Sequence, residues 1–117
     1  MAELRPGQIE PNEFELAILE HLAQKVPCLG PLIPKLHVLS REFTGVGCYT
    51  NFRCDESTPD LGDRDVGLDA NISMPNVPMG LCAVLSCENG KPKVLEICSY
   101  GKDHWDGVFE GFAIEAA

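Results

Sequence analysis

Basic residues are scarce in this sequence: nine lysines and arginines stand against eighteen aspartates and glutamates, and the net charge is −9 at pH 7. Proteins that bind nucleic acid gather lysine and arginine on one face to displace counterions from phosphate, and an anionic membrane surface attracts the same residues. The composition therefore argues against both partners. It fits simple solubility, or an acidic face that steers a basic protein partner.

Long apolar runs are also missing. The longest, GLCAVLSC (80–87), is far shorter than the roughly 20 residues of a membrane helix. The N-terminus shows no charged segment followed by an apolar one, so no secretory signal is visible. We therefore expect a soluble, cytoplasmic protein. Its 117 residues suit one domain, with a flexible lead-in over 1–11 and the folded part over 12–117.

None of the six cysteines forms a C-x-x-C pair, so neither a zinc knuckle nor a thioredoxin-like motif is present. In a reducing compartment such thiols stay free, and several lie in apolar runs, where cysteine packs as a small buried hydrophobe. A phosphate-binding loop is absent too, because T-G-V-G (44–47) lacks the P-loop spacing and lysine. No motif indicates a cofactor.

The segment NEFELAILEHLAQKV (12–26) predicts a helix. Asn12 is a suitable N-cap, and Glu15, three residues on, can complete a capping box. Apolar residues at every fourth position form one stripe: Phe14, Ile18 and Leu22. Pro27 then ends the helix.

After residue 32 the pattern becomes strand-like. Six segments are predicted to be strands: 35–44, 48–54, 65–73, 81–88, 91–100 and 108–114. Asn89-Gly90 joins two of them and favours a type I′ hairpin turn. We expect an α+β fold in which the N-terminal helix packs on a curled antiparallel sheet of five to six strands. Cystatin-like rolls have this order, an analogy that carries no function.

The most densely patterned segment is SREFTGVGCYTNF (40–52). A type II′ turn at Gly45-Val46 predicts four cross-strand pairs: Phe43 with Cys48, Arg41 with Thr50, Leu39 with Phe52, and His37 with Cys54. This register sets Arg41 on an otherwise apolar face. A shift of one residue would move every side chain to the other face of the sheet.

Arg41 needs a partner or access to water, because an unpaired buried charge is very costly. Glu96 interrupts the apolar run VLEIC (94–98) and is the expected partner. The pair could fix strand register, or the Arg41 stem could lie on the sheet with its head in water. Alternatively, Arg41, Tyr49 or Thr50, and Glu96 could line a pocket for a small anionic or polar ligand.

REFTGVGCYTNF (41–52) resembles the Arg-x-aromatic-Thr-Gly-Val-Gly-aromatic-aromatic-Thr-x-Phe segment of a family of small uncharacterised bacterial proteins. GLCAVLSCENGKPKVLEICSYGKDHW (80–105) is similar to the family's second half, and the resemblance covers roughly residues 14 to 112. The chain departs at Cys48, where an aromatic is usual, and at Ile97-Cys98, where Gly-aromatic is usual. The resemblance implies a bacterial origin and a compact α+β domain, and it supplies no catalytic residues.

Catalytic candidates are His104 and Glu96. His104 lies between Asp103 and Asp106, and an imidazole near carboxylates can act as a general base. The alternative is an exposed loop histidine beside Trp105, whose ring caps the core. No G-x-S-x-G nucleophile motif is present.

Metal candidates follow from the predicted hairpin register, which places His37 opposite Cys54, with Cys48 further along the same face. Cysteine and imidazole suit zinc, but core packing is the competing interpretation. The acidic segment DESTPDLGDRD (55–65) lacks the ligand spacing of a calcium loop and favours a turn.

We expect a non-catalytic bacterial domain that acts through protein–protein contact, as an acidic inhibitor or immunity-type protein against a basic partner, or as a homodimer. The alternative is a small-ligand-binding protein or weak enzyme with a polar pocket around Arg41 and Glu96. A thiol or zinc protein is a third interpretation.

Overall fold

The computed structural model describes residues 10–54 and 60–116, so most of the expected lead-in and part of the acidic segment (55–65) lie outside the described residues. The predicted helix is α1 (Glu13–Lys25), and its capping box is confirmed. The Glu15 N–H donates to Asn12 Oδ1 at 2.8 Å, and the Asn12 N–H donates to Glu15 Oε1 at 2.9 Å. None of the helices in this part of the chain has the length and apolar character that crossing a membrane requires.

A second helical segment, η1 (Pro27–Lys35), follows at once and was not predicted. It is a 3₁₀ helix that contains Pro31 and Pro34, residues that would break an α-helix. It still buries Leu29 and Leu32. The prolines thus end α1 without returning the chain to an extended conformation.

One antiparallel sheet forms the rest of the fold, with strand order β1-β2-β6-β5-β4-β7 and β3 also paired to β5. Its strands are β1 (Leu36–Phe43), β2 (Gly47–Cys54), β3 (Arg64–Gly67), β4 (Ala70–Met74), β5 (Val77–Glu88), β6 (Lys91–Ser99) and β7 (Ala113–Ala116). The predicted α+β fold is confirmed. Among the described residues the count of strands rises to seven, because the single strand expected over 65–73 is divided into β3 and β4, which pair with successive parts of β5.

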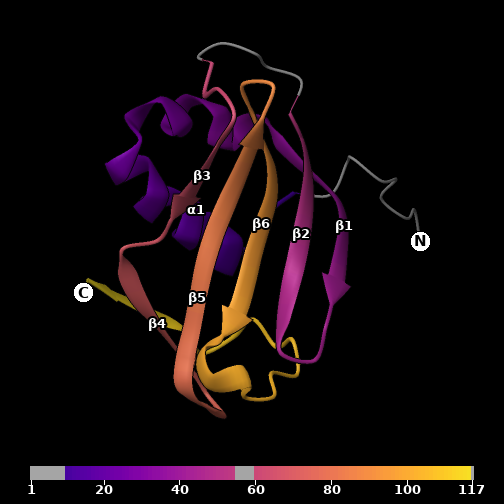
Figure 1. The fold of residues 1–117 in the computed structure, drawn as a ribbon, viewed down its shortest axis with the longest axis vertical. Coiled ribbons are helices and arrows are strands. Elements are labelled where there is room, and N and C mark those ends of the chain that lie inside the picture. The colour runs from indigo at the N-terminus through magenta and orange to yellow at the C-terminus, as the bar shows by residue number, and fades with distance from the viewer. Residues whose placement is uncertain (1–9, 55–59, 117) are drawn as a thin grey trace.

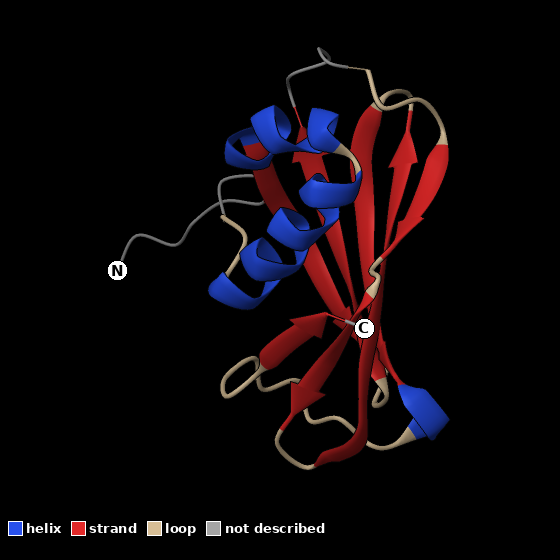
Figure 2. Cartoon of the chain, turned by 90° about the vertical axis from the view of Figure 1, so that its left-hand side faces the viewer, coloured by secondary structure: helices blue, strands red, loops and turns tan. Residues whose placement is uncertain are grey.

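The helices and the sheet form two layers (Figures 1 and 2). Figure 2 shows α1 and η1 on one side of the strands, with the short η2 (Tyr100–Lys102) at one end of the sheet. The core lies between the layers, where the apolar stripe of α1 meets inward side chains of the central strands: Phe14, Ile18, Leu22, Leu85, Leu95 and Ile97. Burial of this apolar surface is the main stabilising term. The opposite, outer face of these strands carries no α-helix in the described part of the chain.

The predicted hairpin register holds near the turn and is wrong further away. Phe43 opposes Cys48 and Arg41 opposes Thr50, as expected, but a bulge at Leu39 then shifts the pairing. Beyond it the pairs are Val38 with Phe52, His37 with Arg53, and Leu36 with Cys54. An extra residue in one strand moves the following side chains to the other face. The bulge thus buries Val38 and Leu36 and leaves Leu39 40% exposed.

Gly45 and Gly47 of this hairpin are required for different reasons. Gly45 has φ +89°, the positive value that the first position of a type II′ turn needs. At Gly47, a Cβ would overlap the carbonyl oxygen of Ile97, so only glycine lets β2 pair with β6 there. The turn is held from outside as well, since Trp105 N–H donates to Gly45 O at 2.9 Å.

The Asn89-Gly90 turn between β5 and β6 has the conformation expected of it. Asn89 has φ 54° and Gly90 has φ 81°, so both central residues are left-handed, as a type I′ turn demands. Glu88 opposes Lys91 directly below it. This hairpin forms the centre of the sheet.

Candidate functional site

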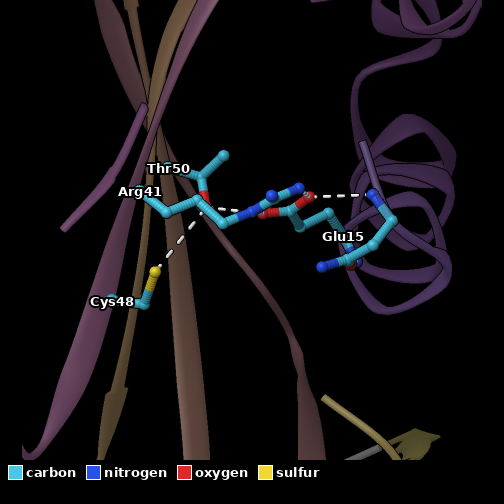
Figure 3. A network of polar contacts seen from close by, with 5 residues as sticks. Glu15, Arg41, Cys48 and Thr50 are labelled. Carbon is cyan, nitrogen blue, oxygen red and sulfur yellow. Dashed lines mark hydrogen bonds and ion pairs between the residues drawn. The ribbon is translucent and has the colours of Figure 1, made fainter. Parts of the chain in front are cut away.

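Arg41 pairs with Glu15 of α1, and the predicted Arg41–Glu96 pair is wrong. Arg41 Nε lies 2.9 Å from Glu15 Oε2, and Nη2 lies 2.7 Å from Oε1, a two-point contact (Figure 3). The reason is strand alternation. Arg41 opposes Thr50, whose side chain faces the helices, whereas Glu96 opposes Tyr49 and faces outward.

The Glu15 carboxylate is fully buried, with 0% exposure, and all of its accepting capacity is used. Oε1 accepts from the Asn12 N–H and from Arg41, and Oε2 accepts from Arg41 and from Thr50 Oγ1 at 2.6 Å. A buried charge is tolerated when it is paired and hydrogen-bonded in this way. Glu15 therefore joins α1 to β1 and β2 and has no accepting position left for a ligand.

The remaining neighbours of this network are consistent with a structural role. The Arg41 side chain is 22% exposed, and its guanidinium carbon lies 5.8 Å from the centroid of the Phe109 ring. The hydrogen bond to Glu15 raises the pKa of Arg41 and outweighs the lowering effect of burial. Burial raises the pKa of Cys48, so this thiol, 3.9 Å from Thr50 Oγ1, stays protonated and unreactive.

Tyr49 and Glu96 lie on the outer face of the sheet, away from Arg41. Tyr49 Oη donates to Glu96 Oε2 at 3.2 Å, and this bond is the main reason that the pKa of Tyr49 is raised. Both residues border a shallow hollow of about 340 Å³ over β2 and β6. The structure thus brings Tyr49 and Glu96 together, but not with Arg41.

His104 is exposed and borders a hollow of about 220 Å³ together with Asp103 and Asp106. Both carboxylates hold the local backbone: Asp103 Oδ2 accepts from Met79 N–H at 3.3 Å, and Asp106 Oδ1 accepts from Val108 N–H at 3.1 Å. None of the described residues lining this hollow is a serine, cysteine, threonine or lysine nucleophile, and Glu96 is not among them. The two catalytic candidates therefore do not share a site.

The metal candidates are not brought together. The bulge places His37 opposite Arg53, so the predicted pairing of His37 with Cys54 is wrong. Cys48 and Cys54 both face the core but are six residues apart on one extended strand, about 20 Å. Within residues 10–54 and 60–116, no group of three or more His, Cys, Asp or Glu side chains is arranged to hold a metal ion.

Strand pairing defines three rows of outward positions on the central strands, and the exposed Arg53 of β2 lies beyond them. From β1 across to β5 or β3 the rows are Glu42, Tyr49, Glu96 and Val84; then Ser40, Asn51, Val94, Ser86 and Asp65; then Gly47, Cys98 and Cys82. We call this surface the outer face. The sequence did not predict this face, because its residues are known only once the bulge and the side on which the helix packs are known. The alternate positions of β2, β5 and β6 are the signal that could have revealed it.

Comparisons with models of protein families, with curated proteins and with solved structures found no match to this chain. The likeness of residues 41–52 and 80–105 to a bacterial family thus stays a prediction from motifs.

Proposed function

We propose that this chain is a non-catalytic protein-binding domain, and that its outer face binds a basic protein. The proposal keeps the function expected from composition and assigns it a surface. The proposal rests on a contrast between polar groups: Glu15 and Arg41 bond to each other inside the fold, while Glu42, Glu96 and Asp65 lie on a face that no α-helix of residues 10–54 and 60–116 covers.

Charge supports a basic partner over a second copy of the chain. The three rows hold three carboxylates, the exposed Arg53 follows Asn51 on the same side of β2, and the whole protein has a net charge of −9. Two such faces would repel each other, whereas a cationic surface would be attracted and guided to this one. Like charge thus disfavours the homodimer at this face.

The chemistry of the outer face also suits a protein interface. Tyr49 is 39% exposed, and it offers a ring and a hydroxyl on a rigid strand, a combination enriched at such interfaces. Val84 and Val94 add small apolar contacts between the carboxylates. The long dimensions of the molecule, 40 and 39 Å, leave room for the roughly 800 Å² per partner of a specific complex.

The test compares two double variants with the same change of charge. Glu42→Lys/Glu96→Lys alters the outer face, and Glu20→Lys/Glu110→Lys alters exposed positions away from it. Each variant and the wild type are immobilised and exposed to a bacterial lysate, and the retained proteins are identified by mass spectrometry.

The proposal expects a basic protein that the wild type and the Glu20→Lys/Glu110→Lys control retain and that the outer-face variant loses. Loss from both variants alike would mean ion exchange without a specific surface. Retention by all three, retention of nothing, or a wild-type dimer that only the outer-face variant dissociates would each contradict the proposal.

A further inference from the structure

We propose that Cys82 and Cys98 form a redox site, in which a peroxide closes the two thiols into one intrachain disulfide. The proposal concerns a modification of the protein and does not depend on the identity of any partner. It rests on the placement of two thiols at directly opposed positions of the central hairpin.

The geometry of the pair allows a disulfide without movement of the strands. Cys82 of β5 opposes Cys98 of β6, and their sulfur atoms are 3.7 Å apart. Opposed residues of an antiparallel pair have Cα atoms about 4.5 to 5.5 Å apart, within the range of about 4.4 to 6.8 Å found across disulfides. Side-chain rotation can therefore bring the sulfurs to bonding distance.

The pair is also accessible. Both cysteines are partly exposed on the outer face, and Cys98 borders the hollow of about 340 Å³ that Tyr49 and Glu96 also line. A peroxide is small and uncharged, so Glu96 does not repel it. By contrast, Cys48, Cys54 and Cys87 are buried in the core.

The reaction balances with the peroxide as the only added reagent. One thiol loses its proton, and its sulfur attacks a peroxide oxygen; the O–O bond breaks, a sulfenic acid forms, and the departing hydroxide takes up the proton as water. The second thiol then attacks the sulfenic sulfur, the S–S bond forms, the S–O bond breaks, and a second water leaves. The two thiols lose two electrons, which the peroxide gains.

The surroundings of Cys98 disfavour its thiolate at neutral pH. Burial, followed by the hydrogen bond with Cys82, raises the pKa of Cys98 to about 11, and the charge of Glu96 acts in the same direction. The thiolate is the attacking form, so attack by Cys98 is slow near pH 7. Reducing agents restore the two thiols.

The experiment treats the 117-residue chain with hydrogen peroxide, alkylates the remaining thiols in denaturant, and maps the peptides by mass spectrometry. We expect a cross-linked peptide joining residues 82 and 98, no alkylation at these two positions, and full reversal by dithiothreitol. Cys82→Ser and Cys98→Ser should each reduce the yield of intrachain disulfide at least tenfold. Cys28→Ser, at an exposed cysteine, should leave it unchanged.

The wild-type map decides the proposal even if a serine variant fails to fold. A disulfide between other cysteines, a disulfide between two chains through Cys28, or sulfinic acid at Cys98 without closure would overturn it. So would thiols that survive peroxide unchanged while the exposed Cys28 is oxidised.

Discussion

Polar side chains on the two faces of the β1–β2 hairpin lie in opposite environments, buried and fully bonded on one face and exposed on the other. On the inner face, Arg41 and Thr50 meet a carboxylate with 0% exposure, and every accepting position of that carboxylate is filled from within the chain. On the outer face, Tyr49 and Glu96 make one exposed hydrogen bond of 3.2 Å. Alternate residues of the same strand thus belong to different environments.

This difference separates structural from available groups. A buried, fully bonded ion pair fixes how a helix meets a sheet, and losing either partner leaves an uncompensated charge. An exposed hydrogen bond contributes little to stability and can be exchanged for contacts with another molecule. The face that a charged residue occupies therefore decides whether it is held within the fold or available to another molecule.

The largest loss of stability is expected from Arg41→Ala. It leaves Glu15 buried with two of its four hydrogen bonds, and we expect it to lower the free energy of unfolding by about 3 to 5 kcal/mol. Urea unfolding measures this as a lower midpoint with an unchanged slope. Glu96→Ala is the matched control on the outer face. Equal midpoints for the two variants would show that the ion pair is not structural.

Gly47→Ala should disturb both faces together, since Gly47 is where β2 approaches β6 without a side chain. The added methyl group overlaps the Ile97 carbonyl, and we expect the free energy of unfolding to fall by about 1 to 3 kcal/mol. Gly67→Ala, where the new methyl group meets nothing within 4 Å, is the control and should change stability by less than about 0.5 kcal/mol. Similar thermal midpoints for both variants would argue against the close approach.

Thr50→Val tests the inner face alone. It keeps the shape of the side chain and removes the hydroxyl that donates to Glu15 Oε2. We therefore expect the free energy of unfolding, measured by chemical denaturation, to fall by about 1 to 2 kcal/mol. Thr50→Ser keeps the hydroxyl and loses only a methyl group. Should the serine variant prove the less stable of the two, packing rather than the hydrogen bond would explain the buried threonine.

The smallest effect is expected at the outer face, from Glu96→Gln. The bond to the Glu96 carboxylate raises the pKa of Tyr49, because the protonated phenol is the form that donates. Without the negative charge, Tyr49 should ionise at lower pH, nearer its ordinary value, while stability hardly changes. Ultraviolet titration of tyrosinate in the wild type and the Glu96→Gln variant measures the shift. An unmoved titration curve would mean that the hydrogen bond does not form in solution.

Local signals were enough to predict much of the fold. The capping box of α1, the Gly45-Val46 and Asn89-Gly90 turns, and the pairs next to the first turn each depend on residues close together in the chain. The bulge at Leu39 does not: it follows from the gain in burying Val38 and Leu36 against the helices. Register beyond the bulge, and with it the His37–Cys54 pairing, was out of reach for this reason.

The partner of Arg41 was missed for a similar reason. Glu15 already had a local explanation as a capping residue, and 26 positions separate it from Arg41. The sequence predicts Glu96 as the partner because it interrupts an apolar run, but that run alternates between core and outer face, and Glu96 takes an outward position. Which face a strand residue occupies depends on where the helix packs, and a single sequence does not state that.

Glu15 is at once the reciprocal half of a helix cap and the anchor of a strand, and this has a consequence for how such a chain can change over generations. Replacing Glu15 would remove a helix cap and leave the Arg41 guanidinium without its partner. Replacing Arg41 first would leave the Glu15 carboxylate buried without its partner. Neither residue can change alone without a large loss of stability. In descendants of this sequence, residues 15, 41 and 50 should be inherited or lost as a group, and residues 49 and 96 should vary independently of them.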